Sequence, residues 1–300
     1  MWEVTQTHTI MTKLKITGYK EEPIISFDDW ERHALPPMRK KLHWKKGRSA
    51  YELGSSWTST GEPAVPHELI DLLESHESTR GAMILTGITE HETALPYSVR
   101  GPRCHDLALL AEQCGCSMTI CIEAKADESF GGTVAEELTK AKNRVEEKNR
   151  ADPERRAVTM FPKRLDWLTR ALLGLPAFND DQFKAISDGV SPLPYQLLSA
   201  IAGTLLEAAY RNASKAVFVV HEFRTELTED VKLKANANAL NRFLGILLSA
   251  NKAGVSEKFE LECGNIIGPI YIADRSVTGP INVPYHIPLF IGKIRTDLLA

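Results

Sequence analysis

A stretch that begins like a buried strand, SMTICIEAK at residues 117–125, ends in an acid and a base. Because side chains alternate across a strand, Glu123 and Lys125 are expected on one face together with Cys121. A carboxylate binds hard cations, and an ammonium group stabilises negative charge that develops in a reaction. The pair therefore indicates a chemical site, although a solvated end of an edge strand is the alternative interpretation.

An upstream aspartate adds a second carboxylate to this pair. If residues 105–112 form a hairpin with the stretch, and the turn is centred between Cys114 and Gly115, Asp106 falls opposite Glu123. Opposed residues have Cβ atoms about 5 Å apart, so the two carboxylates could hold one Mg²⁺ or Mn²⁺ ion. The ion would make a bound water more acidic, and Lys125 would orient that water or offset transition-state charge. This chemistry fits phosphodiester hydrolysis, but a turn shifted by one residue would move Asp106 to the other face.

The elements that would position these residues alternate between helices and apolar strands. Amphipathic helices are predicted at 65–76, 164–175, 195–212 and 237–250. Strands are predicted at 82–88, 105–112, 117–125, 215–223, 265–277 and 287–295. Residues 27–62 are Trp-rich and irregular in pattern, and 133–156 is a charged helix or arm. We therefore predict an α/β fold in which helices flank a mixed central sheet.

An Asp at the head of one strand and Glu-Ala-Lys at the end of the next, within an α-β-β-β-α-β order, resemble the PD-(D/E)XK nuclease-like superfamily. Longer runs are similar to an uncharacterised bacterial branch of it, namely HWKKGRSAYELGSSW, GITEHETALP, IEAKADESFGGTVAEEL and YQLLSAIAGTLLEA. The chain departs from the superfamily pattern in two places. His105 stands where the nominal Pro would precede Asp106, and Ala200 stands where some relatives carry a Tyr four residues after Gln196.

This resemblance implies a restriction-endonuclease-like core with Asp106, Glu123 and Lys125 as the catalytic trio and Mg²⁺ or Mn²⁺ as cofactor. It also implies a division of the chain. Residues 1–64 would be a basic, Trp-rich extension packed on the core, and 65–300 the nuclease-like domain. That domain would contain a helical insertion at about 133–190 and a C-terminal addition of a helix and strands. The implied activity is metal-dependent hydrolysis of nucleic acid, with DNA as the expected substrate.

Further candidates surround the trio. Glu90 and Glu92 would share a face if their segment is extended, so one of them is a candidate metal ligand, with a solvated loop as the alternative. Gln196, at the start of a predicted core helix, could direct its amide at a metal-bound water or a phosphate, or could simply solvate that helix. Acids of the first helix, a His-Glu pair at a strand end and two loop acids are weaker candidates: Glu68, Glu74, His221, Glu222, Asp127 and Glu128.

A basic run with an interleaved indole is typical of a patch that grips a nucleic-acid backbone and stacks on a base. The residues expected to bind nucleic acid are Arg39, Lys40, Lys41, Trp44, Lys45, Lys46 and Arg48. A solvated charged loop is the alternative.

The bulk composition limits the partners. The chain has 300 residues and a formal net charge of −3, so no overall basic field attracts polyanions, and any nucleic-acid contact must be local. No apolar run reaches the roughly 18 residues of a membrane span, so no membrane partner and a cytoplasmic location are expected. A second copy of the chain is a further candidate partner. The alternative functions are a non-catalytic nucleic-acid- or protein-binding module on a degenerate nuclease fold, and a hydrolase of a small phosphate ester or nucleotide.

Overall fold

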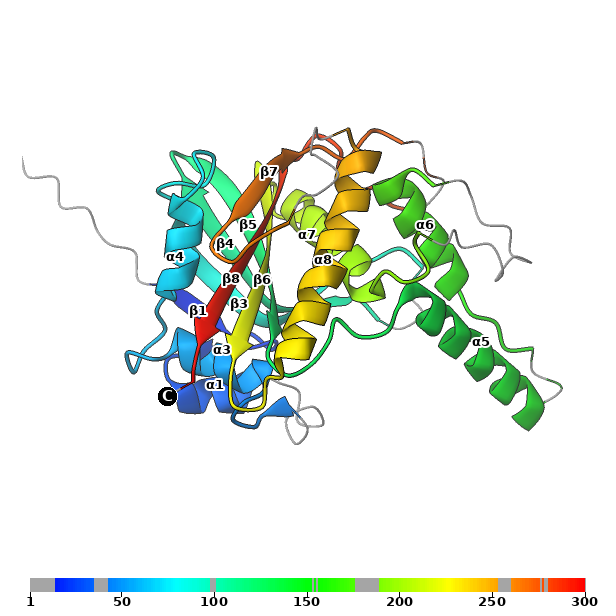
Figure 1. Cartoon of the computed structure of the whole chain (residues 1–300), viewed down its shortest axis with the longest axis horizontal. Coiled ribbons are helices and arrows are strands. Elements are labelled where there is room, and N and C mark those ends of the chain that lie inside the picture. Colours follow the sequence, from blue (N-terminus) through cyan, green and yellow to red (C-terminus); the bar gives the residue numbers. More distant parts are fainter. Residues whose placement is uncertain are drawn as a thin grey trace, which may run out of the picture.

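The computed structural model describes residues 14–34, 43–97, 101–152, 154, 156–175, 189–252, 260–275, 277 and 280–299. A single eight-stranded sheet in the order β2-β1-β3-β4-β5-β6-β8-β7 forms its centre (Figure 1). The strands are β1 (Lys15–Thr17), β2 (Pro23–Ile24), β3 (Met83–Thr93), β4 (Arg103–Gln113), β5 (Cys116–Lys125), β6 (Lys215–Arg224), β7 (Ile266–Ile270) and β8 (Leu289–Asp297). Parallel pairs join β1 to β3, β5 to β6 and β6 to β8, and the other neighbours are antiparallel.

Helices cover both faces of the sheet (Figure 1). They are α1 (Phe27–His33), α3 (Ser49–Trp57), α4 (His67–Glu74), α5 (Val134–Ala151), α6 (Phe161–Leu173), α7 (Tyr195–Tyr210) and α8 (Asp230–Ala250). One buried apolar cluster joins α1, α3 and α4 to the sheet, and we call this side the α4 face. A second cluster joins α6, α7 and α8 to the sheet on the α7 face. The predicted mixed α/β fold, with a central sheet flanked by helices, is therefore confirmed.

The hairpin of β4 and β5 has the predicted register. Pairing runs from Gln113 opposite Cys116 to Leu107 opposite Ile122, and one further step places Asp106 opposite Glu123. The turn consists of Cys114 at φ 50° and Gly115 at φ 78°, and positive φ at both positions is typical of a two-residue hairpin turn.

Near the predicted site, the regular alternation of side chains between the two faces of the sheet is interrupted in both β3 and β4. On β3, Thr89 donates to the carbonyl of Ala34 on the α4 face, whereas His91 lies 2.7 Å from Glu207 of α7. The intervening Glu90 has a φ of 49°, so the segment is not regularly extended there, and the condition under which Glu90 and Glu92 would share a face is not met.

Beside this point, β4 reverses in the same way. Leu107 belongs to the core of the α4 face, whereas Arg103 and His105 pack beneath Gly203 of α7. A Cβ at Gly203 would lie only 2.9 Å from His105 Nε2, so a glycine permits this close approach. Asp106 therefore stands where β4 crosses from one face to the other.

Several boundaries differ from the sequence predictions. Residues 27–62 are not wholly irregular, because they contain α1 and α3, and the side chains of Trp30 and Trp57 are buried. Helix α8 begins at Asp230 rather than near 237, and the strand expected at 265–277 covers only Ile266–Ile270. The last strand, β8, pairs with β6 and so belongs to the same sheet.

The charged segment after Thr133 is a helix, α5, that extends away from the sheet (Figure 1). Thr133 and Glu136 form a reciprocal capping box at the start of α5. The buried residues of this helix are Val134, Leu138 and Ala141. Among the described residues, no helix combines the length and the apolar character needed to cross a membrane.

Candidate functional site

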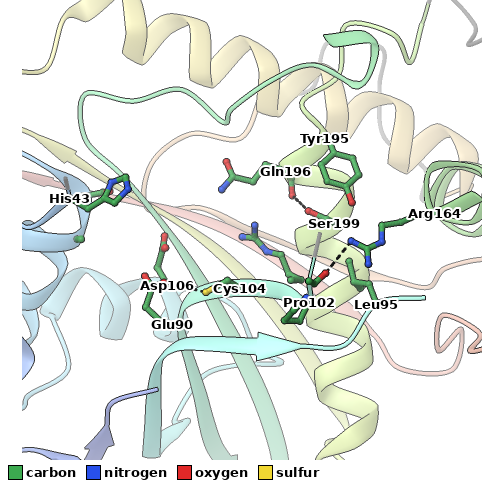
Figure 2. A pocket seen from close by; sticks show the side chains of 14 residues that line it. His43, Glu90, Leu95, Pro102, Cys104, Asp106, Arg164, Tyr195, Gln196 and Ser199 are labelled. Carbon is green, nitrogen blue, oxygen red and sulfur yellow. Dashed lines mark hydrogen bonds between the residues drawn. The ribbon is translucent and has the colours of Figure 1, made fainter. Parts of the chain in front are cut away.

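A cavity of about 380 Å³ opens at the point where β3 and β4 change face. Its wall combines segments that are far apart in the sequence (Figure 2). Representative lining residues are His43, Glu90, Arg103, Asp106, Arg164 and Gln196. The cavity therefore lies between the segment that precedes α3, the end of the hairpin and the first turn of α7.

Glu123 is the centre of the hydrogen-bond network behind this wall. Its side chain is buried and accepts from Lys125 Nζ (2.5 Å), Arg103 Nη2 and Gln196 Nε2. Burial alone would raise the pKa of Glu123, but the charges of Lys125 and Arg103 outweigh it and lower the pKa below its ordinary value. Glu123 is therefore an anion held by two cations and one amide.

Asp106 is an acid in a setting that opposes its ionisation. Its Oδ2 accepts from the backbone N–H of Ala124 at 2.7 Å, which fixes the carboxyl between β4 and β5. Burial and the charges of Glu123 and Glu90 raise its pKa well above the ordinary value, although Lys125 acts in the opposite direction. A cation bound among these acids would relieve their repulsion.

Lys125 is a buried cation, exposed by only 5%. Burial would lower its pKa, but Glu123 and Asp106 more than compensate and raise the pKa. Its Nζ also lies 5.5 Å from the ring centroid of Phe130. Because Lys125 remains protonated, it can hold or orient an anion or a water, but it cannot act as a base at neutral pH.

The first turn of α7 brings Gln196 to the same place. The loop before α7 is attached to the segment after β5, since Tyr195 N–H donates to the carbonyl of Gly132 and Val134 N–H to that of Leu193. Gln196 lines the cavity and donates to Glu123, which lies beneath it. The structure thus brings together Asp106, Glu123, Lys125 and Gln196, with Glu90 beside Asp106.

Two buried arginines at the cavity were not found from the sequence. Arg103 was missed because simple alternation along β4 places it and Asp106 on opposite faces, and only the reversal of the strand makes them neighbours. Arg164 had a usable signal, since it lies on the apolar stripe of α6 with Phe161 and Leu168, where a charged residue is unusual.

Other candidate acids lie elsewhere. Glu92 is exposed, pairs with Cys104 across the strands and does not line the cavity. Glu68 accepts from Thr296 Oγ1 at 2.5 Å, and Glu74 accepts from the backbone N–H of Gly81. These acids serve local contacts away from the cavity.

His221 and Glu222, at the end of β6, also contact other protein side chains away from the cavity. His221 is buried, contacts Thr296 Oγ1 through Nε2, and burial lowers its pKa to about 3. Glu222 is buried between Lys293 (3.1 Å) and Arg295 (2.9 Å). The interpretation of His221 as a core residue is therefore favoured over a role as general base.

The basic run is described only in part, since Arg39, Lys40 and Lys41 lie outside the described residues. Lys45 and Lys46 are exposed, next to His43, Ser49 and Ala50 of the cavity wall. Trp44 is half-buried, with its ring centroid 5.4 Å from that of Phe27 and 5.4 Å from that of Tyr51. Arg48 pairs with Asp127 at 3.2 Å, so among the described residues of this run the exposed cations are Lys45 and Lys46 together with a partly neutralised Arg48.

The residues present supply oxygen donors for a hard cation. Asp106 and Glu123 oppose one another, and Glu90 contributes a third negative charge to the field at Asp106. Within the described part of the chain, no three His, Cys, Asp or Glu side chains form a ready-made metal cluster. Two carboxylates are nevertheless a sufficient protein contribution for Mg²⁺, which keeps several waters and is completed by substrate phosphates.

The fold and the site together define a mixed α/β protein with a buried acid–base cluster at the wall of a small cavity. Residues 23–297 match the sequence model of the family described as "Domain of unknown function (DUF6946)", so the chain belongs to this family. Comparison with curated proteins and with solved structures gives no significant match.

Proposed function

We propose that this protein is a metal-dependent nuclease that hydrolyses phosphodiester bonds, with DNA as its main substrate. The observation that carries the proposal is that Asp106 and Gln196 line one cavity, while Glu123 and Lys125 lie directly behind its wall and Glu123 is hydrogen-bonded to Gln196. The order α4-β3-β4-β5-α7-β6, with α5 and α6 inserted before α7, supports a restriction-endonuclease-like core of the PD-(D/E)XK type.

Asp106 and Glu123 would hold a Mg²⁺ or Mn²⁺ ion, with Glu90 close enough to influence it. When bound, such an ion supplies a Lewis acid and a more acidic water. The donor chemistry fits, because ionised Asp106 is destabilised by burial and by the neighbouring acids, and a bound cation would offset both. Arg103 would compete with the cation for Glu123, since its guanidinium already bonds to Oε2.

The remaining residues act by position and charge. Lys125, protonated and fixed beside Glu123, would orient the attacking water and offset negative charge on the phosphate in the transition state. The Gln196 amide, held at the first turn of α7, would hydrogen-bond to the same water or to a phosphate oxygen. Lys45 and Lys46 would attract the nucleic-acid backbone toward the cavity mouth.

A second candidate function is a non-catalytic nucleic-acid- or protein-binding module on the same fold. The observation that favours it is that both carboxylate oxygens of Glu123 already accept hydrogen bonds from the protein. Arg103 donates to one oxygen, and Lys125 and Gln196 donate to the other. A carboxylate with this many donors can serve structure alone.

A calorimetric titration of the metal-free protein with Mn²⁺ separates the two candidates. A nuclease site predicts one saturable binding event that is lost in Glu123→Gln and retained in Glu92→Gln. Glu92 is a suitable control because it is an exposed acid that lies outside the cavity wall. Absence of binding by the folded wild-type protein would favour the non-catalytic module.

A further inference from the structure

The cavity has ends of opposite charge. Asp106 and Glu90 lie on one side, and Arg164, Tyr195 and Ser199 lie on the other (Figure 2). The acidic side belongs to the proposed metal site. The basic side has no role in the proposed hydrolysis and needs its own explanation.

Arg164 is a buried cation, exposed by only 3%, without a carboxylate partner among the described residues. Its Nε donates to the carbonyl of Pro96 at 3.0 Å and its Nη1 to that of Gly101 at 3.2 Å. Its Nη2 is buried with no hydrogen-bond partner in the described part of the chain. A buried guanidinium with a free donor is costly unless an anion completes its contacts.

The start of α7 contributes to the same end of the cavity. Tyr195, Gln196 and Ser199 of its first turns line the wall, and the residue at the N-cap, Pro194, provides no side-chain cap. The N-terminus of this 16-residue helix therefore adds a partial positive charge to that of Arg164, although the N–H groups of Tyr195 and Leu197 already donate to the carbonyls of Gly132 and Pro194. A buried arginine beside a helix N-terminus is well suited to an anion such as a phosphate.

The size of the cavity limits what can bind there. A volume of about 380 Å³ lies at the small end of the roughly 300–1,000 Å³ range of ligand pockets. This volume is of the size of a single nucleotide.

We propose that Arg164, with the first turn of α7, binds a terminal phosphate of the nucleic-acid substrate, so that the enzyme acts at strand ends. This proposal rests on the proposed nuclease function for the identity of the polymer. The phosphate subsite itself rests on Arg164, on the helix N-terminus and on the cavity.

The first test examines the subsite without cleavage. Thermal unfolding is followed in EDTA with a nucleoside 5′-monophosphate, a 3′-monophosphate or the free nucleoside. The wild-type protein should be stabilised by one of the monophosphates and not by the nucleoside. Arg164→Gln should lose this shift, Arg164→Lys should keep part of it, and Arg170→Gln should keep all of it. Arg170 is the matched control because it lies on the same helix and pairs with Asp166.

The second test uses DNA with defined ends. Single strands and duplexes that carry a 5′-phosphate, a 3′-phosphate or only hydroxyl groups are bound in EDTA and then cleaved with Mg²⁺ or Mn²⁺. We expect about tenfold or greater preference for one kind of phosphate end, and loss of that preference in Arg164→Gln. Equal binding and cleavage of all ends by the wild-type protein would overturn the end-directed proposal.

The two tests separate failure of the subsite from failure of the nuclease. A monophosphate shift that depends on Arg164, without cleavage of any polymer, would keep the phosphate site and reject the nuclease. Metal-dependent cleavage without any preference for ends would do the reverse. If Arg164→Gln does not fold, the ligand shift and end preference of the wild type and of Arg164→Lys still decide the question.

Discussion

Asp106 and Glu123 face one another across the hairpin, yet their surroundings affect them in opposite ways. Two cations lower the pKa of Glu123, whereas burial and neighbouring acids raise that of Asp106. Neighbouring carboxyls with opposite pKa shifts are typical of functional sites. An acid such as Asp106, whose ionised form is unfavourable in the folded protein, is more readily explained by a function than by stability.

Replacement of Asp106 by Asn tests this imbalance. The amide oxygen can still accept from the backbone N–H of Ala124, while the repulsion with Glu123 and Glu90 disappears. We expect an equal or greater free energy of unfolding in EDTA, together with a loss of cleavage of at least about a hundredfold. Chemical denaturation and a cleavage assay measure the two effects. A variant that is clearly less stable and still active would contradict the assigned role.

Glu207 of α7 is a residue on which the geometry of the site depends indirectly. It accepts from Thr93 (2.8 Å) and Arg211 (2.6 Å) and pairs with His91 (2.7 Å), so it attaches the end of β3 to α7. Burial would raise its pKa, but these partners lower the pKa to about 2. A lowered carboxyl pKa means that the stabilisation is present above the ordinary value of 4.5 and is lost as pH falls toward 2.

Glu207→Gln should therefore cost about 3 kcal/mol of unfolding free energy at pH 7. The difference from wild type should shrink as pH falls from about 4.5 to about 2. Denaturation curves at several pH values measure this dependence. A constant difference over the whole range would show that the charge of Glu207 does not stabilise the fold.

At the scale of elements, the register of the hairpin decides which residues meet. Gly115 holds a φ of 78° in the turn, and no heavy atom lies within 4 Å of the position that a Cβ would take. Gly115→Ala should thus cost only the backbone conformational term, about 1 kcal/mol, with cleavage unchanged. A large loss of activity at full folding would indicate that the turn does more than fix the register.

The sequence was sufficient to predict this hairpin, because a two-residue turn and strict alternation determine the pairing on their own. It did not predict the reversal at Glu90 and Asp106, because a positive φ at a glutamate has no local signal.

The short helix α1 was missed because its segment is rich in aromatic residues. Ser26, whose side chain caps the helix by accepting from Asp29 N–H, was an available sign of its start.

At the scale of the whole molecule, the cavity is built by segments that only the complete fold brings together. His43 precedes α3, Arg164 lies on α6 and Gln196 lies in the first turn of α7, yet all three line one wall with Asp106. Periodicity places each residue on an element but does not specify which elements meet. The trio on one hairpin was therefore predictable, whereas the meeting of this hairpin with Arg164, on the separate element α6, was not.

The distribution of charge leads to a prediction about nucleic-acid binding. The net charge of the chain is −3, so attraction of a polyanion must come from a local group such as the exposed Lys45 and Lys46. The double variant Lys45→Ala, Lys46→Ala should weaken DNA binding uniformly and reduce the salt slope by about 2. Lys142→Ala, Lys148→Ala on α5 is the matched control. Anisotropy titrations at several salt concentrations give the slopes, and equal slopes for both double variants would remove this segment from the interface.

The central claim is that Asp106, Glu123 and Lys125 form a hydrolytic site. It is tested most directly by incubating the purified protein with supercoiled plasmid, linear duplex, single-stranded DNA and RNA. Each substrate is combined with Mg²⁺, Mn²⁺ or EDTA, and Glu123→Gln is tested in parallel. We predict metal-dependent cleavage of DNA that EDTA and Glu123→Gln both abolish. Failure of the folded wild-type protein to cleave any polymer, or undiminished cleavage by Glu123→Gln, would contradict the account.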